Sequence, residues 1–124
     1  MKIYTPEIAL FLLSIAMQDT KHGIAGGAEI GIGGTYYTED GISFNESYEI
    51  GDVVTQAVYS LGKNKYAFVG NMNGREGPAI STSGGIFFEG HFWPKDFCPE
   101  APARYGAFPS EKTWYITGGT WPQD

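Results

Sequence analysis

The sequence predicts an all-β fold made of β-propeller blades, with about two four-stranded antiparallel blades and the start of a third. Three observations lead to this prediction. The chain repeats at a spacing of 44 residues, its apolar stretches are short and rich in aromatic residues, and glycine-containing turns separate them. Repeats of about 40 to 50 residues occur in helical arrays and in propeller blades. Because no long stretch has the apolar period of about 3.6 residues expected of an amphipathic helix, strands explain the repeat better.

The repeat is visible when the chain is shifted by 44 residues against itself. Residues 21–44 then align with residues 65–88 without a gap. Seven of the 24 aligned pairs are identical: Lys21/Lys65, Gly26/Gly70, Gly33/Gly77, Thr38/Thr82, Gly41/Gly85, Ile42/Ile86 and Phe44/Phe88. A partial third copy begins at Trp114. The repeat therefore divides a single domain, residues 1–124, into blade units at about 9–52 and 53–96 and a partial unit at about 97–124.

Each unit contains its strands in a fixed order. First strands are predicted at residues 11–17, 53–61 and 105–108. Second strands follow at 24–25, 66–69 and 114–117, and third strands at 35–38 and 79–82. Short fourth strands are predicted at 42–44 and 86–88, after Asp-Gly and Gly-Gly turns in which glycine adopts positive φ without steric cost.

Composition supports strands and excludes several partners. Glycine accounts for 18 of the 124 residues, roughly twice the usual 7%, and Tyr, Phe and Trp together number 19. The formal charge is −6, which opposes nucleic acid and anionic membrane surfaces. No apolar run reaches the roughly 18 to 20 residues of a membrane helix, so no membrane span is expected. Cys98 is the single cysteine, so no disulfide can form within the chain.

The apolar stretch near the N-terminus has two interpretations. Lys2 precedes it, and small residues at 25–28 could offer a cleavage site, as in a signal peptide. If residues 1–17 are a targeting segment, the protein is secreted or enters an organellar lumen. The repeat favours the other interpretation, a buried strand, and Glu7 does not suit a signal peptide.

Thr38, Asp40, Gly41 and Phe44 form a motif in which Ser or Thr, any residue, Asp and Gly lead to an aromatic residue. With this motif the chain resembles one blade of the Asp-box (BNR-type) β-propellers. This family includes sialidases, sortilin-like receptors and photosystem II stability/assembly factor-like proteins. In the second unit Thr82, Gly85 and Phe88 match the box, but Gly84 replaces the aspartate.

The residues of the box predict a structural role. A short aspartate in a turn accepts hydrogen bonds from backbone amides, glycine adopts the left-handed conformation, and the aromatic ring packs the turn onto the sheet. We therefore expect Asp40 to hold a hairpin rather than to act as a catalytic acid or a calcium ligand.

No other pattern predicts catalysis, a metal or a cofactor. His22, His91 and Cys98 lack the close ligand spacing of a zinc site. His22 aligns with Tyr66 and Trp114 and is expected to pack between blades. The glycine-rich residues 26–34 lack the spacing and following helix of a dinucleotide loop. We expect no catalytic residue, no metal ligand and no cofactor.

The resemblance raises the possibility of glycoside hydrolysis, which requires two carboxyl groups about 5 to 10 Å apart. Sialidase-like sites also use an arginine cluster, whereas this chain has only Arg75 and Arg104. The available carboxylates are Asp40, Glu46, Glu49, Asp52, Glu89, Asp96 and Glu100. The arginine count weighs against a sialidase.

Residues 90–102 interrupt the repeat with three prolines and three aromatic residues, Phe92, Trp93 and Phe97. Prolines and aromatic residues favour an ordered connection. Its alternative roles are packing over a blade edge and recognition of a protein or a sugar.

Three functional hypotheses follow. The first is a non-catalytic interaction or assembly scaffold whose partner is a protein or a glycan. The second is a fragment of a sialidase-like glycoside hydrolase, and the third is a glycan-binding, lectin-like propeller that uses loop aromatics such as Trp93 and Trp121.

Two expectations concern the whole chain. The repeat predicts a buried set made up of Ile15, Ile24, Phe44, Val58, Phe68, Phe88, Phe108 and Ile116. Propellers close with about four to eight blades, and 124 residues hold fewer than three units of 44. We therefore expect a fragment of a larger propeller, or a chain that associates with copies of itself.

Overall fold

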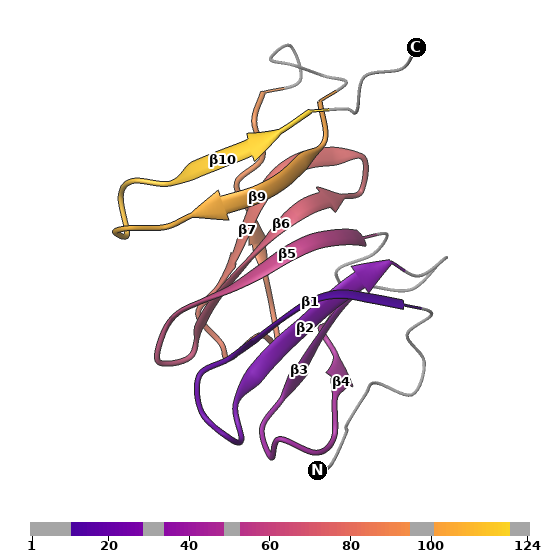
Figure 1. Ribbon diagram of the computed structural model, residues 1–124, viewed down its shortest axis with the longest axis vertical. Helices are drawn as coiled ribbons and strands as arrows, with labels where there is room; N and C mark the ends of the chain where they lie inside the picture. The colour runs from indigo at the N-terminus through magenta and orange to yellow at the C-terminus, as the bar shows by residue number, and fades with distance from the viewer. Residues whose placement is uncertain (1–10, 29–33, 49–52, 95–100, 120–124) are drawn as a thin grey trace.

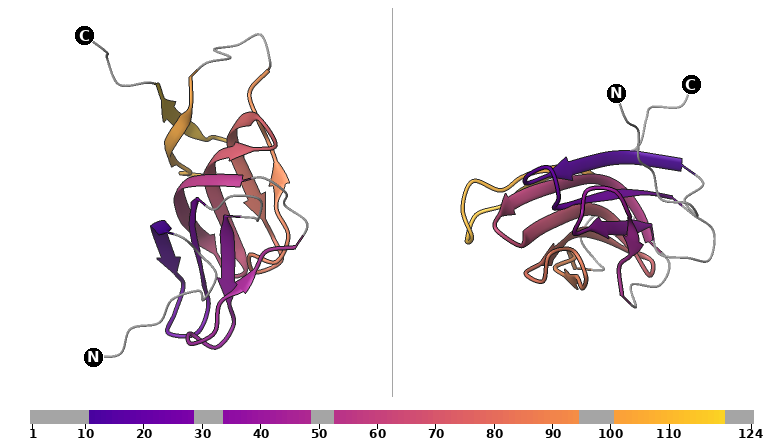
Figure 2. Two further views of the ribbon diagram at one scale, coloured as in Figure 1. Left: turned by 90° about the vertical axis from the view of Figure 1, so that its right-hand side faces the viewer. Right: turned by 90° about the horizontal axis from the view of Figure 1, so that it is seen from below.

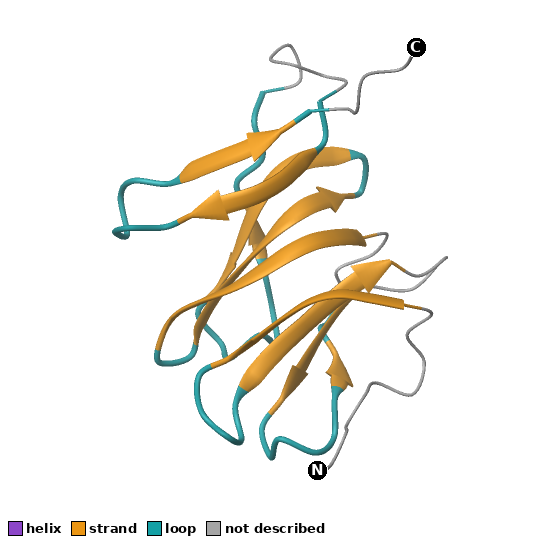
Figure 3. Cartoon of the chain, in the orientation of Figure 1, coloured by secondary structure: helices purple, strands orange, loops and turns teal. Residues whose placement is uncertain are grey.

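The computed structural model describes residues 11–28, 34–48, 53–94 and 101–119, and every regular element in them is a strand. Figure 3 shows this all-β architecture, with no helix in the described segments. The strands form antiparallel sheets whose pattern repeats along the chain, as the sequence predicts. The described residues do not close into a ring of blades.

The first unit is a four-stranded antiparallel meander. It contains β1 (Phe11–Met17), β2 (Gly23–Ala28), β3 (Thr35–Thr38) and β4 (Asn45–Glu46). Each strand pairs with the next along the chain. The strand at 11–17 confirms a strand in this stretch, but the prediction that it is buried was wrong, because Leu13 and Ile15 are at least half exposed. Residues 1–10 lie outside the described part.

The second unit repeats the meander with β5 (Val53–Gly62), β6 (Lys65–Met72), β7 (Arg75–Ser81) and β8 (Glu89–Gly90). Asn73 and Gly74 join β6 to β7 with φ of 53° and 83°. Two successive positive φ values match the right-handed twist of the strands in a tight hairpin. A single bridge between Ala28 and Val54 joins this sheet to the first.

The third unit is a hairpin of β9 (Ala103–Ala107) and β10 (Tyr115–Gly118). In Figure 1 the three units follow one another along the long axis, with β5–β7 between β1–β4 and β9–β10. The left view of Figure 2 shows the same succession from a further side. Among the described residues, the second unit is therefore the only one flanked by a unit on both faces.

The predicted fourth strands were placed wrongly. Residues 42–44 and 86–88 lie in bends and coil, and β4 and β8 begin at Asn45 and Glu89. The residues assigned to a strand instead form the turn, because backbone amides there bond to side chains rather than to a neighbouring strand. Thr82 likewise follows β7 rather than ending it.

A β-bulge recurs in each unit at the same place in the pairing of its first two strands. The shifts of register fall between Leu12 and Ser14, between Thr55 and Ala57, and between Thr117 and Gly118. In all three, a glycine lies at the shift: Gly27, Gly70 and Gly118. A bulge bends its strand and increases its twist.

Aligning the units by this bulge gives their structural spacing. Leu12 corresponds to Thr55 and Gly27 to Gly70, which is a spacing of 43 residues rather than 44. Ala57 corresponds to Tyr105 and Gly70 to Gly118, a spacing of 48. Since successive strand residues point to opposite faces, a difference of one residue reverses the face assigned to every side chain.

The main core lies between the first and second units. Its buried members are Ile24, Val53, Val58, Tyr66, Phe68, Ala79 and Phe88. The rings of Phe68 and Phe88 pack with centroids 5.0 Å apart. This cluster ties the two sheets together as a single hydrophobic layer.

The predicted buried set is confirmed in part. Ile24, Val58, Phe68 and Phe88 are at most 5% exposed, whereas Phe44, Phe108 and Ile116 are partly exposed. The prediction for Ile15 was wrong, because this side chain is 60% exposed. Ile15 corresponds to Val58 at the spacing of 43, and it lies on the face of β1 that no described unit covers.

Polar contacts also join the units. Val58 N donates to Ser14 Oγ (3.1 Å), and the hydroxyls of Thr35 and Thr55 lie 2.9 Å apart. Ser47 Oγ donates to the carbonyl oxygen of Gly85 (2.6 Å). These bonds satisfy polar groups that packing has removed from water.

Candidate functional site

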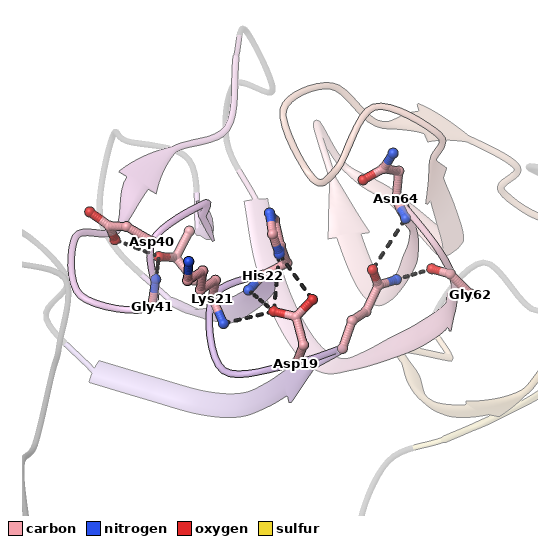
Figure 4. A network of polar contacts seen from close by, with 9 residues as sticks. Asp19, Lys21, His22, Asp40, Gly41, Gly62 and Asn64 are labelled. Carbon is pink, nitrogen blue, oxygen red and sulfur yellow. Dashed lines mark hydrogen bonds and ion pairs between the residues drawn. The ribbon is translucent and has the colours of Figure 1, made fainter.

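The first Asp-box turn is built around the Asp40 carboxylate. Its Oδ1 accepts hydrogen bonds from Ile42 N and Ser43 N, both at 2.8 Å, and from Thr38 Oγ1 at 3.2 Å. Thr38 Oγ1 in turn accepts from Gly41 N at 2.9 Å. Figure 4 shows Asp40 and Gly41 beside the β1–β2 turn, which holds Asp19, Lys21 and His22. Three groups of its own turn therefore bond to Asp40 Oδ1, while the side chain lies at the surface.

The conformation of Gly41 is required by the same turn. Its φ is +77°, and a Cβ there would lie 2.0 Å from the carbonyl oxygen of Thr20. Both facts exclude a larger residue, because the turn packs directly on the β1–β2 hairpin. Phe44 follows at the end of the turn and is partly exposed.

Electrostatics at Asp40 follow from these bonds. The amides of Ser43 and Ile42 hold the pKa of the Asp40 carboxyl below its ordinary value of 3.8. A catalytic acid needs the opposite shift, toward a higher pKa. Asp40 is thus an ionised acceptor of hydrogen bonds at neutral pH.

The second turn uses different residues from those predicted. Ser81 Oγ accepts from Gly85 N (3.0 Å) and lies 3.2 Å from Ser83 Oγ. Ser83 Oγ accepts from Phe87 N at 3.0 Å. Ser81 and Ser83 therefore take the places of Thr38 and Asp40, at the structural spacing of 43 residues. The predicted Thr82 is exposed and does not hold the turn.

Gly84 is the extra residue that restores the spacing of 44 beyond this point. Gly84 and Gly85 have φ of 77° and 90°. A Cβ on Gly85 would lie 2.5 Å from Ile24 Cγ2, so this turn packs against the first unit. Gly85 and Phe88 thus occupy the positions predicted for them, and Phe88 is buried.

An aspartate that the sequence analysis did not single out caps the β1–β2 turn. Asp19 Oδ1 accepts from Lys21 N (2.7 Å) and His22 N (2.8 Å), and His22 Nδ1 lies 3.0 Å from the same carboxylate. These groups, led by the amide of Lys21, lower the pKa of Asp19. The sequence signal that could have identified Asp19 was an aspartate two residues before the backbone amide that it binds, which is position i of an Asx turn.

The expected packing role of His22 was wrong. Nearly half of its side chain is exposed, and its ring bonds Asp19 within the same hairpin. His91 lies elsewhere, with its ring 5.0 Å from that of Trp114 in an edge-on arrangement. Within the described residues, no three His, Cys, Asp or Glu side chains gather in a way that could hold a metal ion.

The described part of the predicted recognition loop lies along β7. His91 N donates to Pro78 O (2.8 Å) and Trp93 N to Glu76 O (3.2 Å), so residues 91–93 continue the ladder of β8. Phe92 lies under the Arg75 guanidinium at 5.8 Å. Phe97 lies outside the described residues. Packing over a blade edge accounts for Phe92, and the backbone of Trp93 bonds to Glu76 and Arg75 at the same edge.

The two arginines do not converge. Arg75 donates to Trp93 O at 3.3 Å, while Arg104 Nε donates to Gly119 O at 3.0 Å. The two side chains belong to β7 and β9, in different units. Their engagement leaves no described arginine pair facing Asp40.

A pocket of about 410 Å³ lies between the second and third units. Its walls are Leu61, Ile80, Phe108, Pro109 and Trp114, and its polar residues are Lys65, Thr82, Ser110 and Glu111. Lys65 Nζ and Glu111 Oε1 are 2.7 Å apart. Apolar walls with a few polar groups are typical of small-molecule sites. Sequence reasoning missed it because its residues come from three separate segments.

Among the described residues, no helix is both long and apolar enough to cross a membrane. No family model, curated protein or solved structure matches the chain.

Proposed function

We propose that this chain is a non-catalytic interaction scaffold built from blades of the Asp-box type, nearer to the assembly-factor-like propellers than to the sialidases. The observation that carries the proposal is the use of Asp40. Its carboxylate bonds to Thr38, Ile42 and Ser43 within one turn. A group with this role stabilises the repeat and leaves no general acid in the box.

The alternative of a sialidase-like hydrolase has less support. It needs a second carboxyl group across a cleft and cations for the sugar carboxylate. The guanidinium groups of Arg75 and Arg104 bond to carbonyls in separate places. In the scaffold proposal both arginines have a structural role, because each binds a backbone carbonyl of the fold.

Turnover of fluorogenic sialosides and common glycosides tests the proposal. We expect no hydrolysis above the buffer rate by the purified chain. The matched variants are Asp40→Asn and Glu39→Gln, which change neighbouring carboxylates. Hydrolysis that is lost in Asp40→Asn and kept in Glu39→Gln would reject the scaffold in favour of the hydrolase.

Glycan binding is the second candidate, and the pocket favours it. Trp114 and Phe108 offer aromatic walls, while Lys65 and Glu111 offer a donor and an acceptor at one place. An aromatic wall suits the apolar face of a sugar ring. A glycan array compares the chain with Trp114→Ala and, as a control outside the pocket, Trp93→Ala. Selective binding lost only in Trp114→Ala would support this candidate.

A further inference from the structure

The outward face of β1 is more apolar than its inward face. Leu13, Ile15 and Met17 are 50%, 60% and 39% exposed. The intervening Ser14 and Ala16 face the second unit, where Ser14 Oγ accepts from Val58 N. A sheet with one solvated face normally turns its polar residues outward. This reversed pattern is typical of a face that another surface covers.

The opposite end of the molecule also has a bare face. Tyr105 in β9 and Tyr115 in β10 are 63% and 62% exposed. The alternate residues face the second unit: Gly106 N donates to Tyr59 Oη at 2.7 Å, and the Phe108 ring lies 5.3 Å from that of Tyr59. The two bare faces therefore point away from the central unit in opposite directions along the stack.

The second unit, which lies in the centre, has a counterpart of each of these two faces, and both counterparts are covered. Val58 corresponds to Ile15 and is 5% exposed, because the first unit lies on it. On its other face, Ala57 and Ala67 correspond to Tyr105 and Tyr115, and they are 5% and 0% exposed beside the third unit. The described part of the chain contains two contacts between units, the first with the second and the second with the third. In both, the C-terminal-facing side of one unit packs on the N-terminal-facing side of the next.

We propose that a second copy of this chain stacks head to tail on the first, with the β9–β10 face of one copy against the β1 face of the next. The contact continues the unit-to-unit interface already present twice within the chain. It would bury Tyr105 and Tyr115 against Leu13, Ile15 and Met17. The inference rests on the proposed scaffold function and names its partner. Such a heterologous contact builds either a ring or an open stack of copies.

Sedimentation velocity over the micromolar range tests the contact with Ile15→Lys, which blocks the β1 face, and Tyr105→Lys, which blocks the β9–β10 face. Each lysine would have to bury an unpaired charge, so we expect association to weaken about tenfold or more. Phe87→Lys is the matched control, since Phe87 is 55% exposed in a turn of the second unit, whereas the two faces belong to the first and third units. It should associate like the unmodified chain.

An equimolar mixture of the two blocked variants gives the decisive result. The intact β9–β10 face of Ile15→Lys can bind the intact β1 face of Tyr105→Lys, so the mixture should form a dimer and go no further. Circular dichroism and thermal unfolding of each variant establish that both are folded. If either loses its fold, Ile15→Ser and Tyr105→Ser take their places in the same mixture.

Three results would overturn the inference: a monomeric unmodified chain, a blocked variant that associates as strongly as Phe87→Lys, or folded variants whose mixture stays monomeric. A chain that is monomeric and also inactive on glycosides would reject the second copy while leaving the scaffold proposal intact. Hydrolysis lost in Asp40→Asn would reject the scaffold without altering the sedimentation result.

Discussion

At the scale of single residues, hydrogen bonding separates side chains that hold the fold from those that only look reactive. The sequence predicts that Asp40 holds a hairpin rather than acting as a catalytic acid, and three groups of its own turn bond to it. Ser83 performs a similar task without a charge, by accepting from Phe87 N. A turn of this kind needs an acceptor at that place, and a carboxylate is only one way to supply it.

Replacing Asp40 with alanine should lower the free energy of unfolding at neutral pH, because amides of the turn lose their acceptor. The pKa of Asp40 is lower in the folded chain than its ordinary 3.8. Its ionised form therefore contributes stability above that value, and the contribution is lost as pH falls through the folded pKa. Urea unfolding of Asp40→Ala and the control Glu39→Ala across this acidic range measures the effect. A constant gap between Asp40→Ala and the unmodified chain down to the most acidic pH would contradict it.

Tyr66 offers a second test at this scale. Its ring is buried, and no described residue bonds its hydroxyl. An unsatisfied buried hydroxyl costs about 1–3 kcal/mol, so Tyr66→Phe should leave stability unchanged or raise it by about 1 kcal/mol. The matched change is Tyr59→Phe, which removes the bond from Gly106 N and should cost about 0.5–1.5 kcal/mol. Chemical denaturation measures the free energy of unfolding of both variants. A larger loss of stability for Tyr66→Phe than for Tyr59→Phe would show that the Tyr66 hydroxyl is hydrogen-bonded.

The same residue predicts an alkaline effect. Burial raises the pKa of Tyr66 above its ordinary value of 10.0. A group whose folded pKa is raised contributes stability below its unfolded pKa, and this is lost as pH rises toward the folded pKa. The unmodified chain should therefore lose more stability above pH 10 than Tyr66→Phe does. Equal alkaline losses in thermal melts of the two proteins would argue against a buried phenol.

At the scale of elements, the recurring bulge fixes the geometry of each unit. A Cβ on Gly70 would lie 2.1 Å from the carbonyl oxygen of Val54, and one on Gly118 would lie 2.2 Å from that of Pro102. These carbonyls occupy equivalent places beside the bulge in the second and third units. Glycine is needed there because backbone, rather than a movable side chain, fills the space.

Gly70→Ala should destabilise the chain by about 3 kcal/mol, at the upper end of the cost of overpacking, because the clashing atom belongs to the backbone. Gly84→Ala measures a different cost of replacing a glycine, which is backbone strain at positive φ. Its φ is +77° but the nearest atom is 3.9 Å away, so only left-handed strain of about 1–2 kcal/mol is expected. Guanidinium unfolding ranks the two variants. The reverse order would show that the bulge tolerates a side chain.

Sequence reasoning recovered the first three strands of the first two units but misplaced their fourth strands and some of the faces. Three of the seven identities that set the spacing at 44, Gly41/Gly85, Ile42/Ile86 and Phe44/Phe88, were matched to residues beyond the extra Gly84. Before that residue the structural spacing is 43, and a slip of one residue turns every side chain to the other face. This is why His22, which aligns with Tyr66 at a spacing of 44 but with Lys65 at a spacing of 43, was predicted to pack between blades. Repeats rich in glycine hide such a slip because glycines match at several shifts.

The two candidate sites, the Asp-box turn and the pocket, differ in how far the sequence predicts them. The Asp-box turn could be predicted because its residues are adjacent, and Asp40 and Gly41 are the residues that such a turn needs. The pocket could not be predicted, since Leu61, Ile80 and Trp114 meet only when the third unit packs on the second. Contacts between units depend on the spacing that the sequence left ambiguous.

At the scale of the whole molecule, stability should be greatest in the middle of the stack. The second unit is covered on both faces, and residues 66–70 of β6 are all buried. The third unit has no described partner on its outer face. In stacked repeats each unit depends chiefly on its neighbours, so amide exchange should be slowest in β5 and β6 and faster in β9 and β10.

Phe108 is the residue whose loss should detach the third unit. Its ring packs against Tyr59 at 5.3 Å and Trp114 at 6.0 Å. Because Phe108 is partly exposed, Phe108→Ala should cost less than the roughly 3–5 kcal/mol of a fully buried phenylalanine. The loss should fall on local opening of β9 and β10, since β5–β7 retain their contacts with the first unit.

Hydrogen exchange resolved along the chain measures this local opening of β9 and β10. In Phe108→Ala the amides of β9 and β10 should exchange at least about tenfold faster, a factor that corresponds to 1.4 kcal/mol, while those of β6 keep their protection. Phe87→Ala is the control, because it removes an exposed ring from a turn of the second unit. Equal acceleration in β6 and β10 would mean that the three units open as one, and that the stack has no graded stability.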